Sequence, residues 1–328
     1  MSQNLLFIGP VFNSYHKIIF KTIKDSGKYD NVYFLHECPL YSLALFGFIT
    51  SIFPSIKPLL IKHFNKLILK CVKKRSIDSI FIIRGEYVKK ETIDECYSLN
   101  PNLTMTAYNW DSIKNNSNFR IFLCPRVEAY TFDPGDANTE KNIHYLPLFS
   151  SWKETGYNIS TYRKIYDISF VGGYREDGRM DYLSEMRALC ERNKMIMFTH
   201  CFIRFGAYLK NRKRFNIKYQ DITFEKMAYQ KYLECVQKSK AVLDIQSSTQ
   251  TGLTMRTMEV LSLGVKLVTT NKSIIKSEFY NENLVYVIDD IESIRENENE
   301  IIDFISKETT PAIEVLSLSE WLKQMNIV

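Results

Sequence analysis

The stretch QSSTQTGLTMRTMEVLSLGVKLVTTN, residues 246–271, contains a polar loop, an amphipathic helix, a glycine and a short apolar strand. Its apolar side chains recur at the spacing of one helix face and predict a helix that begins near Leu253 or Thr254. Gly264 follows the helix at the C′ position, where glycine readily adopts the left-handed backbone. A loop, a helix and an apolar strand in this order are typical of an α/β protein with a parallel sheet.

The same alternation of apolar and helical runs extends along both halves of the chain. In the first half, buried parallel strands are expected at 4–9, 31–36, 79–85 and 103–109, with helices near 14–26, 41–75 and 88–99. In the second half, strands are expected at 166–173, 195–200, 215–221, 240–246 and 283–289, with helices near 178–192, 224–238 and 291–306.

A polar stretch at 150–164 separates the two series and reads as a linker. The expected fold class is therefore α/β, with two Rossmann-like domains that face a cleft. The first domain is expected at 1–155 and the second at 156–312. A final amphipathic helix within 313–328 could cross back to the first domain.

The composition describes a soluble globular protein. The chain has 328 residues, of which 45% are hydrophobic and 24% charged, and a formal net charge of +6. This charge is too small for a dedicated nucleic-acid-binding protein, so no nucleic-acid partner is expected. The seven cysteines form no C-x-x-C pair and the N-terminus does not resemble a signal peptide, so we expect a cytoplasmic protein with reduced thiols.

Basic segments favour contact with a membrane surface. The apolar run 40–53 is too short to cross a bilayer, but the basic amphipathic run 57–75 follows it, and a second basic segment stands at 204–218. Such segments suit an anionic lipid surface. A buried helix at 40–53 beside a solvated basic helix face would give the same pattern.

Candidate site residues of the first half stand in the loops that leave its strands, because ligands bind at the carboxyl ends of parallel strands. They are His16 after the first strand, Glu86 after the strand at 79–85, and Asp111 after the strand at 103–109. Each could contact an acceptor or act as a general base. Each loop is also compatible with ordinary turn and helix-cap chemistry.

Paired glycines end the strand at 166–173 in the second half. Gly172 and Gly173 let backbone amides approach a ligand closely, and the N-terminus of the next helix favours an anion. Arg175 adds positive charge to this loop. The G-x-G-x-x-G fingerprint is absent, so this is not the dinucleotide-binding motif.

The loop and helix within 246–271 supply the remaining candidate contacts. The residues at the mouth of the helix, whose first-turn amides suit a phosphate, are Gln250, Thr251, Gly252 and Thr254. Arg256 in the first turn can pair with a diphosphate, and Glu259 one turn later can accept hydrogen bonds from ribose hydroxyls. A structural helix with an Arg–Glu pair at i, i+3 would also fit.

The residues RTMEVLSLGVKLVTTN, 256–271, resemble the donor-nucleotide motif of GT-B glycosyltransferases. The similarity is greatest to the spore-maturation-type group and to group 1 enzymes of lipopolysaccharide biosynthesis. In these, an arginine precedes a glutamate by three residues and a glycine follows it by five, as Arg256, Glu259 and Gly264 do here. The segment ISFVGGYRE resembles the opening of their second domain. Many group 1 enzymes have a second glutamate eight residues before the first, where this chain has Thr251.

The resemblance implies a glycosyltransferase that moves a sugar from a nucleotide-sugar donor to a surface glycan such as lipopolysaccharide or capsule. Glu259 would hold the ribose and Arg256 the phosphates. The acceptor, a glycan or a lipid-linked glycan, would lie near the first-half residues, and a lipid-linked one would place the enzyme on the inner face of the cell membrane. The sequence contains no D-x-D motif, so no metal and no cofactor besides the nucleotide-sugar co-substrate are expected.

Two alternatives stay open at this level. One is a catalytically silent scaffold of the same fold in glycan assembly. The other keeps the fold but transfers a polyol phosphate in place of a sugar.

Overall fold

The computed structural model describes residues 3–12, 14–37, 56–158, 162–174, 178–211, 222–247, 250–308 and 311–328. The apolar run at 40–53, the strand expected at 215–221 and Arg175 lie outside these residues. The chain divides into two compact units. Unit 1 comprises 1–154, 249–252 and 316–328, and unit 2 comprises 155–248 and 253–315.

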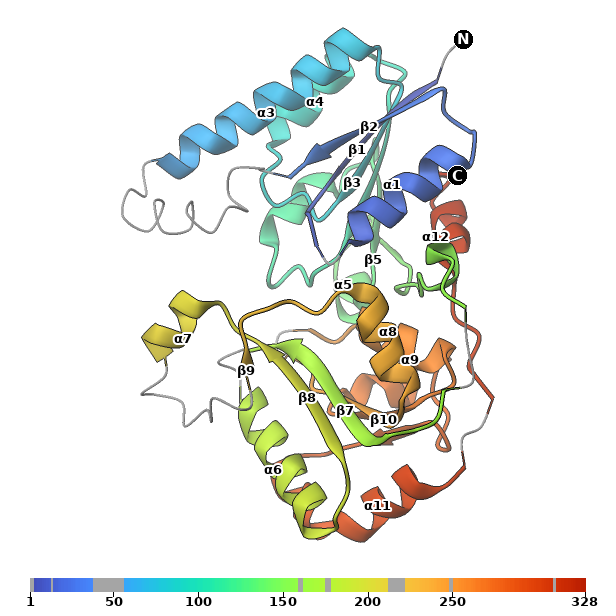
Figure 1. The fold of residues 1–328 in the computed structure, drawn as a ribbon. Helices are drawn as coiled ribbons and strands as arrows, with labels where there is room; N and C mark the ends of the chain where they lie inside the picture. The colour runs from blue at the N-terminus through green and yellow to red at the C-terminus, as the bar shows by residue number, and fades with distance from the viewer. Residues whose placement is uncertain are drawn as a thin grey trace. The chain divides into compact units, whose positions relative to one another are not determined.

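Unit 1 is built on a six-stranded parallel sheet (Figure 1). Its strands are β1 Asn4–Gly9, β2 Asn31–His36, β3 Ser79–Ile83, β4 Thr104–Asn109, β5 Glu128–Thr131 and β6 His144–Tyr145. They stand in the order β2-β1-β3-β4-β5-β6, so the direction of strand addition reverses between β1 and β3. In open parallel sheets, the crevice at such a reversal point is where ligands bind.

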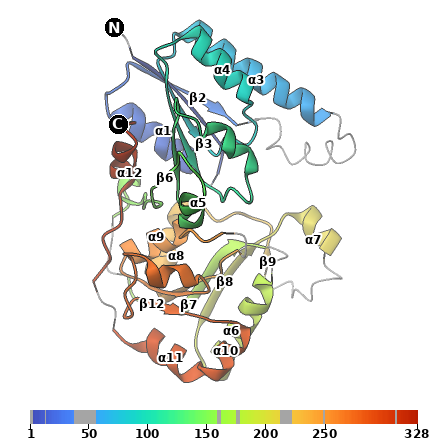
Figure 2. The ribbon, with the colours of Figure 1, turned by 180° about the vertical axis from the view of Figure 1, so that it is seen from behind.

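Helices cover both faces of the unit 1 sheet. They are α1 Tyr15–Asp25, α3 Ile56–Arg75, α4 Lys90–Leu99, α5 Pro134–Thr139 and α12 Leu318–Gln324, with 3-10 turns at Ser117–Phe122 and Lys153–Thr155. Helices α3 and α4 lie side by side (Figures 1 and 2). Side chains alternate between the faces of a strand, and Leu6 and Ile8 of β1 form one core with Ile68 of α3 and Ile93 of α4.

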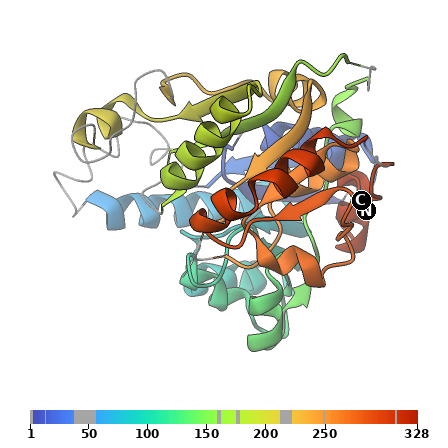
Figure 3. The same ribbon diagram turned by 90° about the horizontal axis from the view of Figure 1, so that it is seen from below.

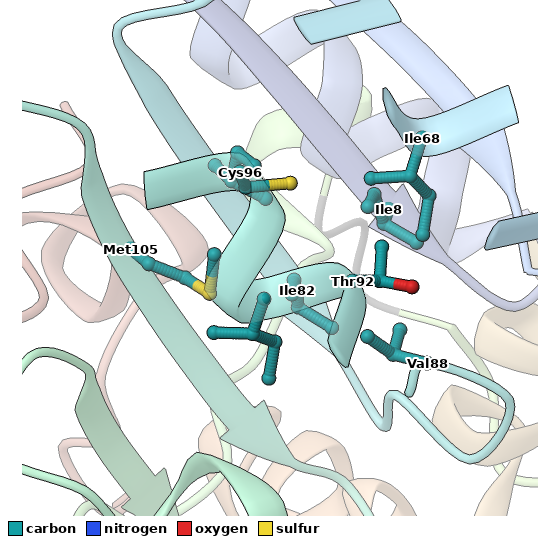
Figure 4. A pocket seen from close by; sticks show the side chains of 9 residues that line it. Ile8, Ile68, Ile82, Val88, Thr92, Cys96 and Met105 are labelled. Atoms are coloured by element: carbon teal, nitrogen blue, oxygen red, sulfur yellow. The ribbon is translucent and has the colours of Figure 1, made fainter. Parts of the chain in front are cut away.

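A small apolar cavity lies within this core (Figure 4). Its lining includes Ile8, Ile82, Val88 and Met105. The only hydroxyl of the lining, that of Thr92, donates to Asn65 Oδ1 at 2.7 Å. The cavity is therefore a packing gap between α4 and the sheet, and it offers no charged group to a ligand.

Helix α12 packs on the opposite face of the sheet, against strand side chains that point away from the core described above. Trp321 is fully buried, with its ring centroid 4.6 Å from that of Tyr108 in β4 and 6.1 Å from that of Phe81 in β3. Ser317 and Glu320 form a capping box at the start of the helix. The expected C-terminal helix is present, and it belongs to unit 1.

Unit 2 contains a second six-stranded parallel sheet. Its strands are β7 Tyr166–Gly173, β8 Met197–Phe202, β9 Ile222–Thr223, β10 Ser239–Asp244, β11 Lys266–Thr269 and β12 Val285–Val287. Their order, β12-β11-β10-β7-β8-β9, reverses between β7 and β10. The prediction of an α/β fold with two parallel sheets is confirmed.

Helices also cover the unit 2 sheet on both faces. They are α6 Arg179–Arg192, α7 Phe205–Asn211, α8 Tyr229–Gln237, α9 Met255–Ser262, α10 Ile291–Glu296 and α11 Glu298–Ser306, with a 3-10 turn at Lys272–Lys276. Helices α6, α10 and α11 share one apolar core with β7 and β10 (Figure 3). The single helix expected at 291–306 is two helices that meet at Asn297.

The helix of the 246–271 stretch is α9. It begins at Met255, and the side chain of its N-cap residue Thr254 accepts from the Thr257 amide. Gly264 has a φ of +66°, so the predicted left-handed position after the helix is confirmed. Among the described residues, no helix has the length and apolar character needed to span a membrane.

Candidate functional site

Asp244 organises the carboxyl end of β10 in unit 2. This carboxylate is almost completely buried and ends the strand at the reversal point of the sheet. Its Oδ1 accepts from Arg256 Nη1 at 2.5 Å, and its Oδ2 accepts from the hydroxyls of Thr254 at 2.8 Å and Thr257 at 3.0 Å. One carboxylate thus fixes the first turn of α9 against the end of the strand.

Gly172 lies against the guanidinium group of Arg256. A Cβ atom placed on Gly172 would stand 3.1 Å from Arg256 Nη2 and 2.9 Å from the ring of Phe170. The same guanidinium lies 5.7 Å from the centroid of the Phe170 ring. The absence of a side chain at Gly172 therefore lets Arg256 reach the backbone at the end of β7.

Gly173 is held by a buried arginine. Arg179 donates to the carbonyl oxygens of Gly173 at 3.0 Å and Ile245 at 2.9 Å, which ties together the chain segments that leave β7 and β10. These two strands flank the reversal point, so Arg179 fixes the edge at which Gly172 and Arg256 lie.

Glu259 faces helix α8. Its side chain is buried, and its Oε1 accepts from the Tyr229 hydroxyl at 2.5 Å. Burial, and next the charge of Glu259, raise the pKa of Tyr232 well above its usual range, which places this second tyrosine near the carboxylate. The Tyr232 hydroxyl is buried and has no hydrogen-bond partner among the described residues.

Gln250, Thr251 and Gly252 belong to unit 1, whereas Thr254, Arg256 and Glu259 belong to unit 2. The Asp133 carboxylate accepts from the amides of Thr251 at 2.8 Å and Gly252 at 3.2 Å, and also from the Thr251 hydroxyl. Asp133 in addition caps the N-terminus of α5. These loop amides are therefore engaged by a buried carboxylate.

Gly252 is required by close packing. An added Cβ would stand 2.4 Å from the Phe132 ring and 2.7 Å from the Phe132 carbonyl oxygen. Asp111 also reaches this loop, because its Oδ1 accepts from Gln250 Nε2 at 2.7 Å and from Asn115 Nδ2 at 2.9 Å. Asp111 therefore makes both a turn contact, with Asn115, and a contact with the loop, through Gln250.

Glu86 lies at the reversal point of unit 1 and forms an ion pair with Arg84. Arg84 has a φ of +74°, a left-handed conformation that is uncommon for a residue with a side chain and recurs at functional sites. Tyr87 N donates to Oε1 of Glu37 at 3.3 Å, which joins this loop to the end of β2. Burial raises the pKa of Glu37 to about 7, against the opposing effect of the Arg84 charge.

His16 lies in α1, and the centroid of its ring is 5.6 Å from the centroid of the Phe34 ring. Burial, followed by the charges of Lys17 and His36, lowers its pKa. Among the described residues, the structure gives no hydrogen bond or ion pair that links His16, Glu86 and Asp111 to one another. Their predicted roles stay predictions, as do those of the donor-loop residues.

Three carboxylates were absent from the predicted set: Glu37, Asp133 and Asp244. Each follows or ends a strand of a parallel sheet, and this position at a strand end was the signal available in the sequence. No group of three or more His, Cys, Asp or Glu side chains within the described part of the chain is placed to hold a metal ion.

Comparisons with known proteins identify the fold. No family model and no curated protein matches the sequence. A Listeria monocytogenes protein assigned as a UDP-N-acetylglucosamine 2-epimerase is 10% identical, with a TM-score of 0.59 over 99% of this chain and 95% of its own. MnaA of S. aureus, solved with UDP, is 8% identical, with a TM-score of 0.59 over 99% and 98%. MurG of Acinetobacter baumannii is 8% identical, with a TM-score of 0.55 over 99% and 98%.

These similarities establish a GT-B-like fold for this chain. At such low identity they carry the architecture alone.

Proposed function

We propose that this chain is an enzyme that takes a nucleotide-sugar donor and transfers its glycosyl group to an acceptor. The observation that carries the proposal is the meeting of Gly172, Asp244 and Arg256 at the reversal point of the unit 2 sheet. This is the position at which open parallel sheets bind nucleotides. Two solved structures of the same fold have UDP or a UDP-sugar in their names, which supports this choice of ligand.

A nucleoside diphosphate gains negative charge as its bond to the sugar breaks. Arg256, the amides at Gly172 and Gly173 and the N-terminus of α9 would stabilise this charge by groups that are fixed before the reaction. Asp244 would keep the guanidinium oriented, because it already holds Nη1. On this basis we propose that transfer requires neither a metal ion nor another cofactor.

Glu259 would bind the ribose of the donor. One of its oxygens accepts from Tyr229, and a carboxylate has lone pairs for further donors, so it would share its charge between the tyrosine and a ribose hydroxyl. Because Glu259 is buried and accepts from Tyr229 of α8, the ribose would have to approach the carboxylate beside that tyrosine.

The acceptor would bind to unit 1, where His16, Glu86 and Asp111 are the candidate bases. Burial lowers the pKa of His16, so its imidazole is neutral near pH 7 and able to take a proton. Asp111 already accepts several hydrogen bonds, which favours an orienting role. An inverting reaction would use such a base, whereas a retaining reaction would use these residues only for orientation.

A surface glycan carried on a lipid is the acceptor we propose, with the protein attached to the cytoplasmic face of the membrane. Helix α3 supports this, because its sequence contains no acidic residue. Its exposed basic residues are Lys57, Lys62, Lys66, Lys70, Lys73, Lys74 and Arg75. Binding to phosphatidylglycerol vesicles should weaken steeply with added salt. Salt-insensitive binding, or none, would contradict electrostatic attachment.

Epimerisation of a UDP-sugar is the second candidate function. The Listeria monocytogenes protein assigned this activity aligns with 99% of this chain and 95% of its own length. Epimerisation needs no acceptor, so the two reactions differ in what they require.

The decisive experiment incubates the purified protein with a panel of nucleotide sugars, with and without glycan acceptors, and analyses products by mass spectrometry and NMR. Transfer gives an acceptor with added sugar mass and a free nucleotide. Epimerisation gives an isomeric nucleotide sugar without acceptor, and polyol-phosphate transfer gives a different added mass.

Absence of nucleotide binding by calorimetry, together with intact glycan synthesis in cells that carry Arg256→Ala, would support a catalytically silent scaffold. Loss of activity in a chelator, restored by magnesium or manganese, would overturn metal independence.

A further inference from the structure

Glu37 lies beside the reversal point of the unit 1 sheet, in a place that the proposed donor chemistry does not use. It follows β2, and its amide donates to the carbonyl oxygen of Gly9 at the end of β1 at 2.9 Å. Its Oε1 accepts from Tyr87 N, which follows β3. Glu37 thus joins the ends of the three strands around the reversal point, where a ligand crevice is expected.

The other oxygen of this carboxylate is also buried. Glu37 is 5% exposed, and its Oε2 is buried without a hydrogen-bond partner among the described residues. Buried polar atoms are normally paired, so an unpaired one indicates a functional or a strained position. Leaving such an atom unpaired disfavours the ionised form more than the protonated form.

Arg84, the cation whose charge acts on Glu37, is paired with another carboxylate. Arg84 forms an ion pair with Glu86, and the side chains of the two residues are 37% and 28% exposed. The charged groups that act on Glu37 within the described residues are Arg84, which favours its ionised form, and Glu86, which opposes it. Two carboxylates therefore act on one guanidinium: Glu37 is buried and Glu86 is partly buried.

We propose that Glu37 is a positioning residue of the unit 1 site, whose ionisation draws Arg84 away from Glu86 and frees the Glu86 carboxylate to accept a proton from a substrate hydroxyl. The role in proton transfer rests on the proposed function, whereas the competition for Arg84 does not. Glu37 releases its proton to solvent. Glu86 receives the hydroxyl proton as the hydroxyl oxygen bonds to the anomeric carbon of the sugar, while the bond from that carbon to the nucleotide phosphate breaks and the nucleotide leaves with the electron pair.

The proposal predicts a pH-dependent exchange of partners. Burial raises the pKa of Glu37 to about 7, so both forms of this side chain are populated near neutral pH. Below this value Arg84 stays with Glu86, and above it the guanidinium is shared with Glu37. The unit 1 site would thus gain a free carboxylate as the pH rises through neutrality.

The test follows side-chain carboxyl signals by NMR in the full-length protein labelled with 13C-glutamate. In the wild type, one buried glutamate should titrate near pH 7, and the signal of Glu86 should shift in the same step. Glu37→Gln, which retains the shape of the protonated form, should remove both changes, and Glu86→Gln should identify the second signal. Glu91→Gln is the matched control, because Glu91 is exposed in the first turn of the neighbouring helix α4.

Glu37→Asp is a second variant, which retains a carboxylate if the glutamine variant fails to fold. It should still titrate above its usual range. Titration of Glu37 below pH 5, or a Glu86 signal that ignores the step near pH 7, would overturn the proposal.

Kinetics separates this inference from the proposed function. With an active donor–acceptor pair, kcat/KM should rise about tenfold per pH unit towards an inflection near pH 7, and Glu37→Gln should abolish that inflection. An unchanged inflection in Glu37→Gln would overturn the role in proton transfer. Coupled NMR titration in a protein that turns over no nucleotide sugar would refute the proposed function while the exchange of Arg84 partners stands.

Discussion

Asp244 and Arg256 form an ion pair of 2.5 Å that joins the end of β10 to the first turn of α9. The Asp244 side chain is 2% exposed and that of Arg256 is 19% exposed, so the anion is sealed while the cation keeps access to solvent. This asymmetry suits an arginine that Asp244 orients from the buried side and that can contact a phosphate from the solvent side.

Replacement of Arg256 by lysine should weaken UDP binding by about tenfold or more. Lysine keeps the charge but loses the planar fork that can contact Asp244 and a phosphate together. Isothermal titration calorimetry with UDP measures the effect, with Arg163→Lys as an exposed control. Equal affinity in the wild type and Arg256→Lys would remove Arg256 from the donor site.

Gly172→Ala should also weaken UDP binding, because its methyl group would stand 3.1 Å from Arg256 Nη2. Gly173→Ala is the matched comparison, since the nearest atom to its added Cβ is the Phe202 carbonyl oxygen at 3.9 Å. The first variant should lose several-fold more affinity than the second in the same calorimetric titration. The reverse order would contradict the placement of the guanidinium.

Tyr229→Phe should lower the free energy of unfolding by about 1–3 kcal/mol, because it removes a hydrogen bond to the buried Glu259 carboxylate. Tyr232→Phe makes the same chemical change nearby, but the Tyr232 hydroxyl has no partner among the described residues. This variant should therefore be near neutral or stabilising. Urea denaturation of the pair decides the point, and similar losses in both would refute the assignment of the Glu259 partner.

Gly252→Ala should destabilise unit 1, because the new methyl group would meet the ring and the backbone of Phe132 at 2.4 and 2.7 Å. Overpacking of this kind costs about 1–3 kcal/mol. Gly206→Ala is the control, since nothing lies within 4 Å of its added Cβ. Thermal unfolding of the two variants checks the difference, and a stable Gly252→Ala protein would mean that the loop does not pack on Phe132.

The contribution of Glu37 to the unfolding free energy should fall as the pH rises from about 4.5 to about 7. The pKa of Glu37 is raised from 4.5 to about 7, so the folded state binds more protons than the unfolded state in this window. Its contribution is complete below the unfolded pKa and is lost through the folded one, on the order of 3 kcal/mol. Burial raises the pKa of Asp136 to about 6, which acts in the same direction.

Denaturation at several pH values measures this slope. Glu37→Gln should flatten most of it and leave the part due to Asp136. A slope that is unchanged in Glu37→Gln would show that Glu37 is ionised throughout the window.

The sequence predicted the elements that bury continuous apolar runs. Strands β1, β2 and β7 match the expected ranges at 4–9, 31–36 and 166–173, because each contains a short run rich in apolar residues. The short helix α5 was missed, since PGDANT lacks an apolar face and is held by the cap at Asp133.

The candidate site was predicted only in part, for a related reason. Arg256 and Gly172 stand out in the sequence, but their contact depends on the order of strands β7 and β10, which no local pattern contains. The hydrogen bonds of Thr251 to Asp133 join residues 118 positions apart, and the burial that raises the pKa of Glu37 is a property of the folded chain.

The division of the chain into two units constrains the point in synthesis at which each unit has all of its residues. Unit 1 draws on three separate segments, the last of which contributes the fully buried Trp321. A ribosome that has produced residues 1–154 has therefore not yet supplied the side chain against which Phe81 and Tyr108 pack. The segments of unit 2 end at residue 315, so the core of unit 2 needs no residue beyond that point, whereas the core of unit 1 needs the segment 316–328.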